Sequence, residues 1–157
     1  MKLLVDADSC PKAARDLVLR RAGKLNLQAV FAANRRIPGL NAAEDNALFP
    51  VQMEICPNKE NSADDRIVEL ARRGDIVVTR DIPLAKRLVE KEVSVIDDRG
   101  RVFNSDNINE MLSIRDFKVG LAQNGLGIER TANYGKKELK LFADSLDRLL
   151  TRINVCP

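Results

Sequence analysis

Histidine and tryptophan are absent from this chain of 157 residues, and aromatic residues make up only 4% of it. Without histidine there is no imidazole to act as a general base and no imidazole ligand for zinc. With so few aromatic side chains, an extended platform for stacking nucleic-acid bases is excluded. Catalytic chemistry would therefore have to be built from carboxylates, hydroxyls and basic side chains, together with a metal ion.

Cysteine is scarce, and its spacing does not suit metal binding. The three thiols of Cys10, Cys56 and Cys156 are odd in number and form no C-x-x-C pair, which argues against a disulfide framework and a zinc ribbon. Cys10 precedes Pro11 at an expected helix start, where the helix dipole lowers a thiol pKa. Because no histidine can activate this thiol, we expect a buried structural role for it. Reduced thiols predict a cytoplasmic protein.

Long apolar runs and a large charge of one sign are also missing. No stretch approaches the roughly 20 apolar residues of a membrane span, and the chain enters an expected strand without a signal-peptide pattern, so we expect no membrane partner. The 26 basic and 23 acidic side chains leave a net charge of only +3, too small to attract a polyanion over the whole surface. No linker or repeat is evident, and we expect one domain over residues 1–157.

What the sequence does contain is an alternation of short apolar strands and helices. Strands are expected at 2–6, 27–33, 51–55, 75–79 and 93–96, with helices at 11–24, 83–90 and from Ser62 to about Gly74, where Ser62 and Asp65 have capping-box spacing. This order predicts an α/β fold: a mostly parallel sheet of about five strands, flanked by helices in three layers. A short arm at 101–103 precedes a helical C-terminal part, with helices expected at 105–114, 115–123 and 136–151, the last of which packs on the sheet.

Carboxylates follow three of the expected strands and open one helix. Because the carboxyl ends of parallel strands meet at one crevice, these groups are expected to converge. Clustered carboxylates repel one another unless a cation neutralises them, and oxygen ligands suit Mg²⁺ or Mn²⁺. Each group also has a structural explanation as a turn or helix-capping residue. The predicted metal ligands are Asp6, Asp64, Asp65, Asp81 and Asp97, and the predicted catalytic residues are Asp6, Asp8, Asp65 and Asp81.

Polar and basic residues lie close in sequence to these carboxylates. Such groups could hold a phosphate beside a metal-bound water, which is the arrangement that phosphodiester hydrolysis requires. Arg35 and Arg36 fall in a long loop expected over 34–46, and arginine matches phosphate geometry. The predicted substrate-binding residues are Asn34, Arg35, Arg36, Thr79, Arg80 and Arg99.

At these residues the chain resembles the YaiI/YqxD-like family of bacterial proteins, which is placed with the PIN-like nuclease superfamily. The resemblance covers nearly the whole length, and its motifs are Val5-Asp-Ala-Asp8 with Cys10-Pro11, Ala33-Asn34, Ala63-Asp-Asp65-Arg-Ile-Val68, Thr79-Arg-Asp-Ile-Pro-Leu-Ala85, Arg99-Gly100 and Ser113-Ile-Arg-Asp-Phe117. It implies a PIN-like fold and Mg²⁺- or Mn²⁺-dependent cleavage of RNA or DNA. PIN-like enzymes usually carry a further acidic residue, for which this chain offers only Glu44 and Asp45.

Two other functions fit the same residues. The order Asp6-x-Asp8, Thr79, Lys86 and Asp97 is similar to that of haloacid-dehalogenase phosphatases, in which Asp6 would be the nucleophile. That interpretation leaves Asp64, Asp65 and Asp81 without a role. The third possibility is a module that binds a metal ion or nucleic acid without catalysis.

Overall fold

In the part of the chain that the structure describes, six strands form one sheet, and there are five helices. The structure is a computed structural model, and it describes residues 1–40, 49–126 and 133–155. The strands are β1 Lys2–Asp6, β2 Gln28–Ala33, β3 Val51–Ile55, β4 Ile76–Val78, β5 Ser94–Ile96 and β6 Val102–Phe103. The helices are α1 Lys12–Leu25, α3 Ser62–Leu70, α4 Ile82–Glu90, α5 Ile108–Gln123 and α6 Lys136–Val155.

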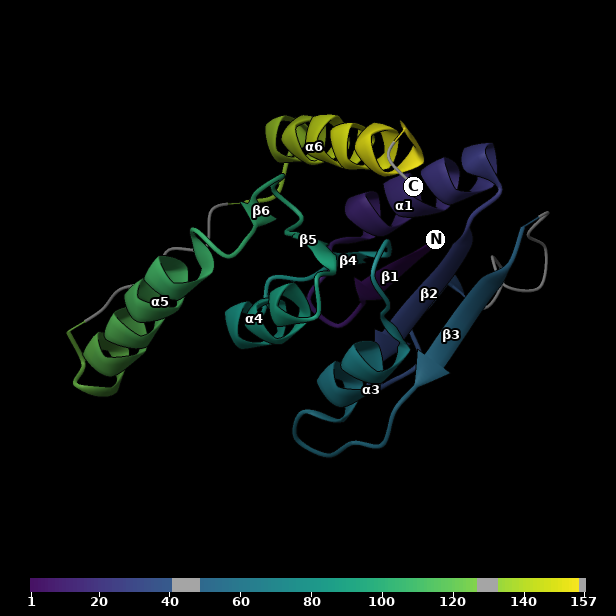
Figure 1. Ribbon diagram of the computed structural model, residues 1–157. Helices are drawn as coiled ribbons and strands as arrows, with labels where there is room; N and C mark the ends of the chain where they lie inside the picture. The colour runs from purple at the N-terminus through teal and green to yellow at the C-terminus, as the bar shows by residue number, and fades with distance from the viewer. Residues whose placement is uncertain (41–48, 127–132, 156–157) are drawn as a thin grey trace.

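The strand order is β3-β2-β1-β4-β5-β6, and every neighbouring pair is parallel except β5 with β6 (Figure 1). The first strand therefore lies near the middle of the sheet, between β2 and β4. In register, Val5 lies beside Phe31 on one side and beside Val78 on the other. The predicted α/β fold with a mostly parallel sheet is confirmed, and the expected arm at 101–103 contains β6.

Helices cover both faces of the sheet, which explains why its strands are apolar on both sides. Leu3 and Val5 of β1 pack in one core with residues of α1 and α6, among them Leu146. Leu4 points to the other face and packs in a second core with residues of α3 and α4, among them Leu88. In Figure 1, α1 and α6 lie above the sheet, and α3 and α4 lie below it. The expected three layers are thus formed, and the C-terminal helix packs on the sheet as predicted.

Two helix predictions need correction. The helices expected at 105–114 and 115–123 form one continuous helix, α5, because neither proline nor glycine interrupts the chain at their junction. The capping box expected at Ser62 does not form: Asn61 is the N-cap residue, without a side-chain capping bond, and Ser62 Oγ donates to Asn34 Oδ1 (3.0 Å). That helix ends at Leu70 rather than near Gly74.

Within the described ranges, no helix combines the length and the apolar character that crossing a bilayer requires.

Candidate functional site

The carboxyl ends of β1 and β4 lie side by side at the centre of the sheet. Asp6 is the last residue of β1, and Thr79 directly follows β4. The helix that follows β1 covers one face of the sheet, and the helix that follows β4 covers the other. Such a reversal is a topological switch point, which is where open α/β sheets bind their ligands.

Asp6 is held in one orientation at this point. Asp6 is only 6% exposed, and its Oδ2 accepts hydrogen bonds from Thr79 Oγ1 (3.0 Å) and Ser9 Oγ (3.2 Å). Both bonds use Oδ2, which leaves Oδ1 for another ligand. Burial raises the pKa of Asp6 above its ordinary value, the two hydroxyl donors lower it, and the charges of Asp81 and Asp8 raise it further.

Asp81 and Asp64 bring two more carboxylates to Asp6. Asp81 is the N-cap of α4, where its Oδ1 accepts from the Leu84 amide (2.9 Å) and its own amide donates to Thr79 Oγ1 (3.0 Å). Asp64 lies half-buried in the first turn of α3. Its pKa is raised to about 6, first by burial and then by the charges of Asp81 and Asp6. The charges of three carboxylates, from β1, α3 and the β4–α4 turn, therefore act on one another.

Asp65 points elsewhere, although it is the neighbour of Asp64. Its side chain is 63% exposed and forms an ion pair with Arg87 of α4 (2.9 Å). Since successive helical residues differ by about 100° in direction, only one of this acidic pair can face β1 and β4. The structure therefore places Asp64, rather than Asp65, beside Asp6.

The predicted residues after β2 are linked to Asp8. The backbone amide of Asn34 donates to Asp8 Oδ2 (2.8 Å), and Arg35 Nε lies 3.9 Å from Asp8 Oδ1. Arg35 and Arg36 are exposed. The side-chain oxygen of Asn34 also accepts a hydrogen bond from the Ser62 hydroxyl. These bonds connect the loops after β1 and β2 with the start of α3 at one edge of the site.

The residues after β5 form a separate network. Asp97 Oδ1 accepts the amides of Arg99 (2.9 Å) and Arg101 (2.8 Å), so this carboxylate organises the β5–β6 turn. Burial raises its pKa, and the charge of Asp98 adds to the effect. The predicted phosphate ligand Arg80 donates from Nε to Asp98 (2.8 Å), whose side chain is 2% exposed. Sequence reasoning missed this partnership, in which Asp98 fixes Arg80 next to Asp81.

A hollow of about 390 Å³ lies between the end of β3 and α3. Ser62 and Asp65 line it, together with the ion pair between Arg66 Nε and Glu54 Oε2 (3.2 Å). No sequence motif indicated this hollow, because its walls come from two elements that are separated by a loop. It offers both donors and acceptors on the side of α3 that carries Asp65.

Metal binding can be judged from the donor atoms and their spacing. Within residues 1–40, 49–126 and 133–155, no three Cys, Asp or Glu side chains stand close enough together to hold a metal ion as they lie. The donor chemistry of Asp6, Asp64 and Asp81 nevertheless fits a hard divalent cation, because all the donors are oxygens that repel one another. The acidic candidates Glu44 and Asp45 lie outside the described residues.

The Cys10 thiol has the structural role that the sequence predicted. It is buried, and its pKa is raised to about 12, chiefly by that burial. The expected lowering by the helix dipole is therefore outweighed, and the group stays a neutral thiol at physiological pH.

Comparison with known proteins gives a family. A family model described as "Uncharacterized BCR, YaiI/YqxD family" matches residues 4–152. A UPF0178 protein of Treponema denticola is 45% identical over 152 residues, which are 97% of this chain and 93% of that protein. A UPF0178 protein of Pseudomonas entomophila is 39% identical, over 98% of each chain. No solved structure matches.

Proposed function

The chain belongs to the YaiI/YqxD family, and from that premise we propose that it is a nuclease that hydrolyses phosphodiester bonds of RNA or DNA with Mg²⁺ or Mn²⁺. The observation that carries this proposal is the convergence of Asp6, Asp64 and Asp81 at the switch point between β1 and β4. The resemblance to PIN-like nucleases, which rests on the same positions, supports it.

Each carboxylate has a distinct part in the proposed reaction. Asp6 and Asp81 would hold the cation, and Thr79 orients both residues by donating to Asp6 Oδ2 and accepting a hydrogen bond from the Asp81 backbone amide. Asp64, with its raised pKa, accepts the proton of the attacking water on a carboxylate oxygen. The water oxygen bonds to phosphorus, the bond from phosphorus to the leaving sugar oxygen breaks, and that oxygen takes up a proton from solvent. When bound, the cation supplies a positive charge that neutralises the carboxylates and polarises the phosphate.

Basic side chains on both sides of the carboxylates hold the substrate backbone. Arg35 and Arg36 are exposed after β2, and Arg80 is fixed by Asp98 after β4. An arginine whose orientation is already set by a buried carboxylate loses little side-chain freedom when it binds a phosphate. The basic residues therefore favour a polyanionic substrate, and this arrangement supports nucleic acid as the partner.

The test compares cleavage by the wild type with that by an Asp6→Asn, Asp81→Asn double variant. Asparagine keeps the size of both side chains and still caps α4, so the fold is preserved. Asp144→Asn on α6 is the matched control, because the pair that Asp144 forms with Lys140 is exposed. Substrates are single-stranded and duplex RNA and DNA with Mn²⁺ or Mg²⁺, and circular dichroism checks folding.

We expect cleavage by the wild type and the control, and a loss of at least about 100-fold in the double variant, as for removal of groups that act together. Equal cleavage by all three proteins would reject the proposal. If the protein instead releases phosphate from phosphomonoesters in the presence of metal and forms an acid-labile phosphate on Asp6, the nuclease proposal is rejected in favour of the phosphatase. Binding of Mn²⁺ without turnover of any substrate would replace it with the non-catalytic module.

We also propose a cytoplasmic location. Cys10 and Cys56 are both free and buried. Unpaired thiols suit a reducing compartment, which supports this location.

A further inference from the structure

Helix α5 stands away from the three layers of the molecule (Figure 1). Among its residues only Ile108, at its start, is buried, where it packs in the core of α3 and α4. Large apolar side chains are exposed further along: Ile114 at 48%, Phe117 at 68% and Val119 at 40%. Helix α5 and the residue Leu126 beyond it hold four of the eight exposed large hydrophobic residues of the described chain.

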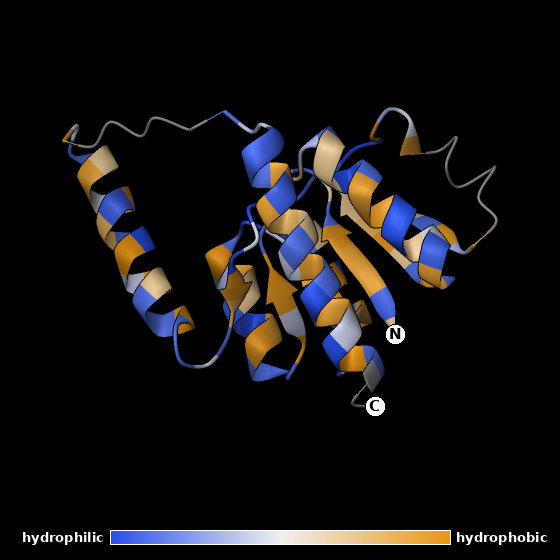
Figure 2. Cartoon of the chain, turned by 90° about the horizontal axis from the view of Figure 1, so that it is seen from above, coloured by the Kyte–Doolittle hydropathy of each residue, from blue (hydrophilic) through white to orange (hydrophobic). Residues whose placement is uncertain are grey.

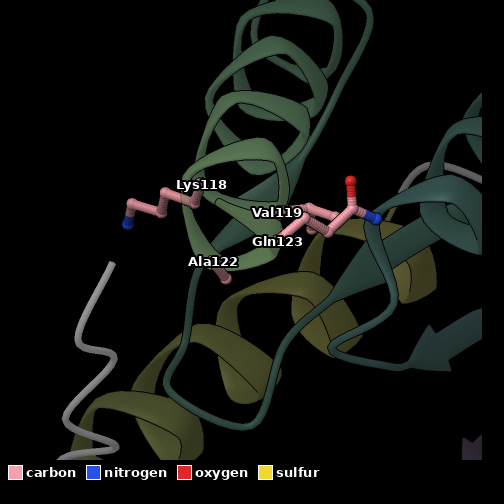
Figure 3. Close-up of a pocket in the computed structure, with 4 residues that line it drawn as sticks. All are labelled: Lys118, Val119, Ala122 and Gln123. Atoms are coloured by element: carbon pink, nitrogen blue, oxygen red, sulfur yellow. The ribbon is translucent and has the colours of Figure 1, made fainter. Parts of the chain in front are cut away.

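The apolar surface of α5 lies on two sides of the helix. Ile114, Phe117 and Leu121 follow one another at helical spacing and form one stripe. On another side, a hollow of about 330 Å³ is lined by Lys118, Val119, Ala122 and Gln123, with Val119 and Gln123 projecting away from Lys118 (Figure 3). Orange and blue residues accordingly alternate around α5 in Figure 2, without the single polar outer face of a surface helix. Such a helix is stable when another surface covers it.

Charges beside the stripe indicate what covers it. Glu110 lies one turn before Ile114 and Lys118 one turn after it, so the three residues form a ridge along α5. If two copies of the helix cross antiparallel at Ile114, a two-fold axis places Glu110 of each copy opposite Lys118 of the other. A parallel crossing would instead oppose like charges. The charge pattern of α5 is thus complementary to itself in one orientation.

We propose that α5 pairs antiparallel with α5 of a second copy of this chain, crossing at Ile114. Phe117 and Leu121 then pack against the start of the partner helix, and two Glu110–Lys118 pairs flank the contact. A helix of 16 residues is only about 24 Å long, so two such helices alone bury less than the roughly 800 Å² per partner of a standard interface. A contact of this size suits a weak dimer that dissociates on dilution.

The first test is the mass of the full chain in solution, followed by sedimentation velocity over a range of concentrations. We expect a species of twice the 17.5 kDa of one chain that dissociates on dilution. Phe117→Glu should weaken the dimer at least 10-fold. Leu141→Glu is the matched control, because Leu141 of α6 is an exposed leucine (49%) on another surface, and it should leave the dimer unchanged.

The second test addresses the orientation of the pair. Glu110→Lys alone and Lys118→Glu alone should each weaken the dimer, because each opposes like charges, and the double variant Glu110→Lys, Lys118→Glu should restore it. Both residues are exposed, so the variants fold. A wild type that stays monomeric up to about 100 µM, well above the micromolar range of weak complexes, overturns the proposal. A control that dissociates as readily as Phe117→Glu, or a double variant that fails to restore the dimer, overturns it equally.

Discussion

The Asp64 carboxylate opposes folding at neutral pH. In the folded chain its pKa is raised from 3.8 to about 6 by burial and by Asp81 and Asp6. Such a group favours the folded state below pH 3.8, and this contribution is lost as the pH rises towards 6. We therefore expect Asp64→Asn to raise the free energy of unfolding at pH 7 by about 1 kcal/mol, a value reduced for solvent screening at a half-exposed site.

Urea unfolding of wild type and Asp64→Asn at pH 7 and pH 3.5, without divalent ions, measures this effect. The gain should be present at pH 7 and absent at pH 3.5. Asp144→Asn serves as the control, and its effect should stay within about 0.5 kcal/mol. If Asp64→Asn instead lowers stability at pH 7, favourable partners rather than repulsion dominate at that carboxylate.

Among single residues, the positions of Asp6, Asp64 and Asp81 could be expected from the sequence, but the orientation of neighbouring side chains could not. Asp6, Thr79 and Asp81 were predictable because each follows a strand end, and parallel strand ends converge. The sequence could not decide whether Asp64 or Asp65 lies beside Asp6, because this depends on how α3 is rotated against β1 and β4. The pairing of Arg80 with Asp98 was missed because 18 residues separate them and neither lies in a motif that links the two.

At the scale of elements, the β5–β6 turn is fitted closely to α6. Gly100 has φ of +89°, and a Cβ there would lie 2.5 Å from the Leu141 carbonyl oxygen. Ser145 Oγ also donates to the Gly100 carbonyl (2.7 Å). We expect Gly100→Ala to lower the free energy of unfolding by about 3 kcal/mol, because the strained φ and the backbone clash add.

Gly74→Ala separates these two causes. Its φ of +91° is similar, but nothing lies within 4 Å of its Cβ position. Backbone strain alone should cost about 1 kcal/mol there, as measured by urea unfolding. Equal losses of unfolding free energy in the two variants would mean that α6 shifts to make room for the added Cβ. The close packing of the turn against α6 would then not contribute to stability.

Elements with strong local signals were predictable, and those decided by the surroundings were not. The apolar strands at the centre of the sheet were found because both their faces are buried. Helix α5 was divided wrongly at Arg115 because its apolar residues follow no single stripe. Helix α3 begins at Ser62 as expected, but the capping box was wrong because Ser62 bonds to Asn34, 28 residues away, instead of capping its own helix.

At the scale of the whole molecule, one sheet separates two hydrophobic cores. Leu146 of α6 and Leu88 of α4 are both fully buried, on opposite faces. The order of strands and helices along the chain was enough to predict this layered design, because alternating βα units cover both faces of a parallel sheet. Neighbouring residues of β1 contribute to both cores, with Leu3 and Val5 in one and Leu4 in the other, which couples the layers into a single folding unit.

This coupling gives the last prediction. Leu146→Ala and Leu88→Ala should each lower the free energy of unfolding by about 2 to 5 kcal/mol, because each leaves a cavity in a closed core. The two side chains lie in separate cores, so the losses should add within about 0.5 kcal/mol in the double variant. Urea unfolding followed by circular dichroism should show one transition for every variant. Two separate transitions in Leu146→Ala would mean that the layer of α1 and α6 unfolds by itself, and that β1 does not join the two cores into one cooperative structure.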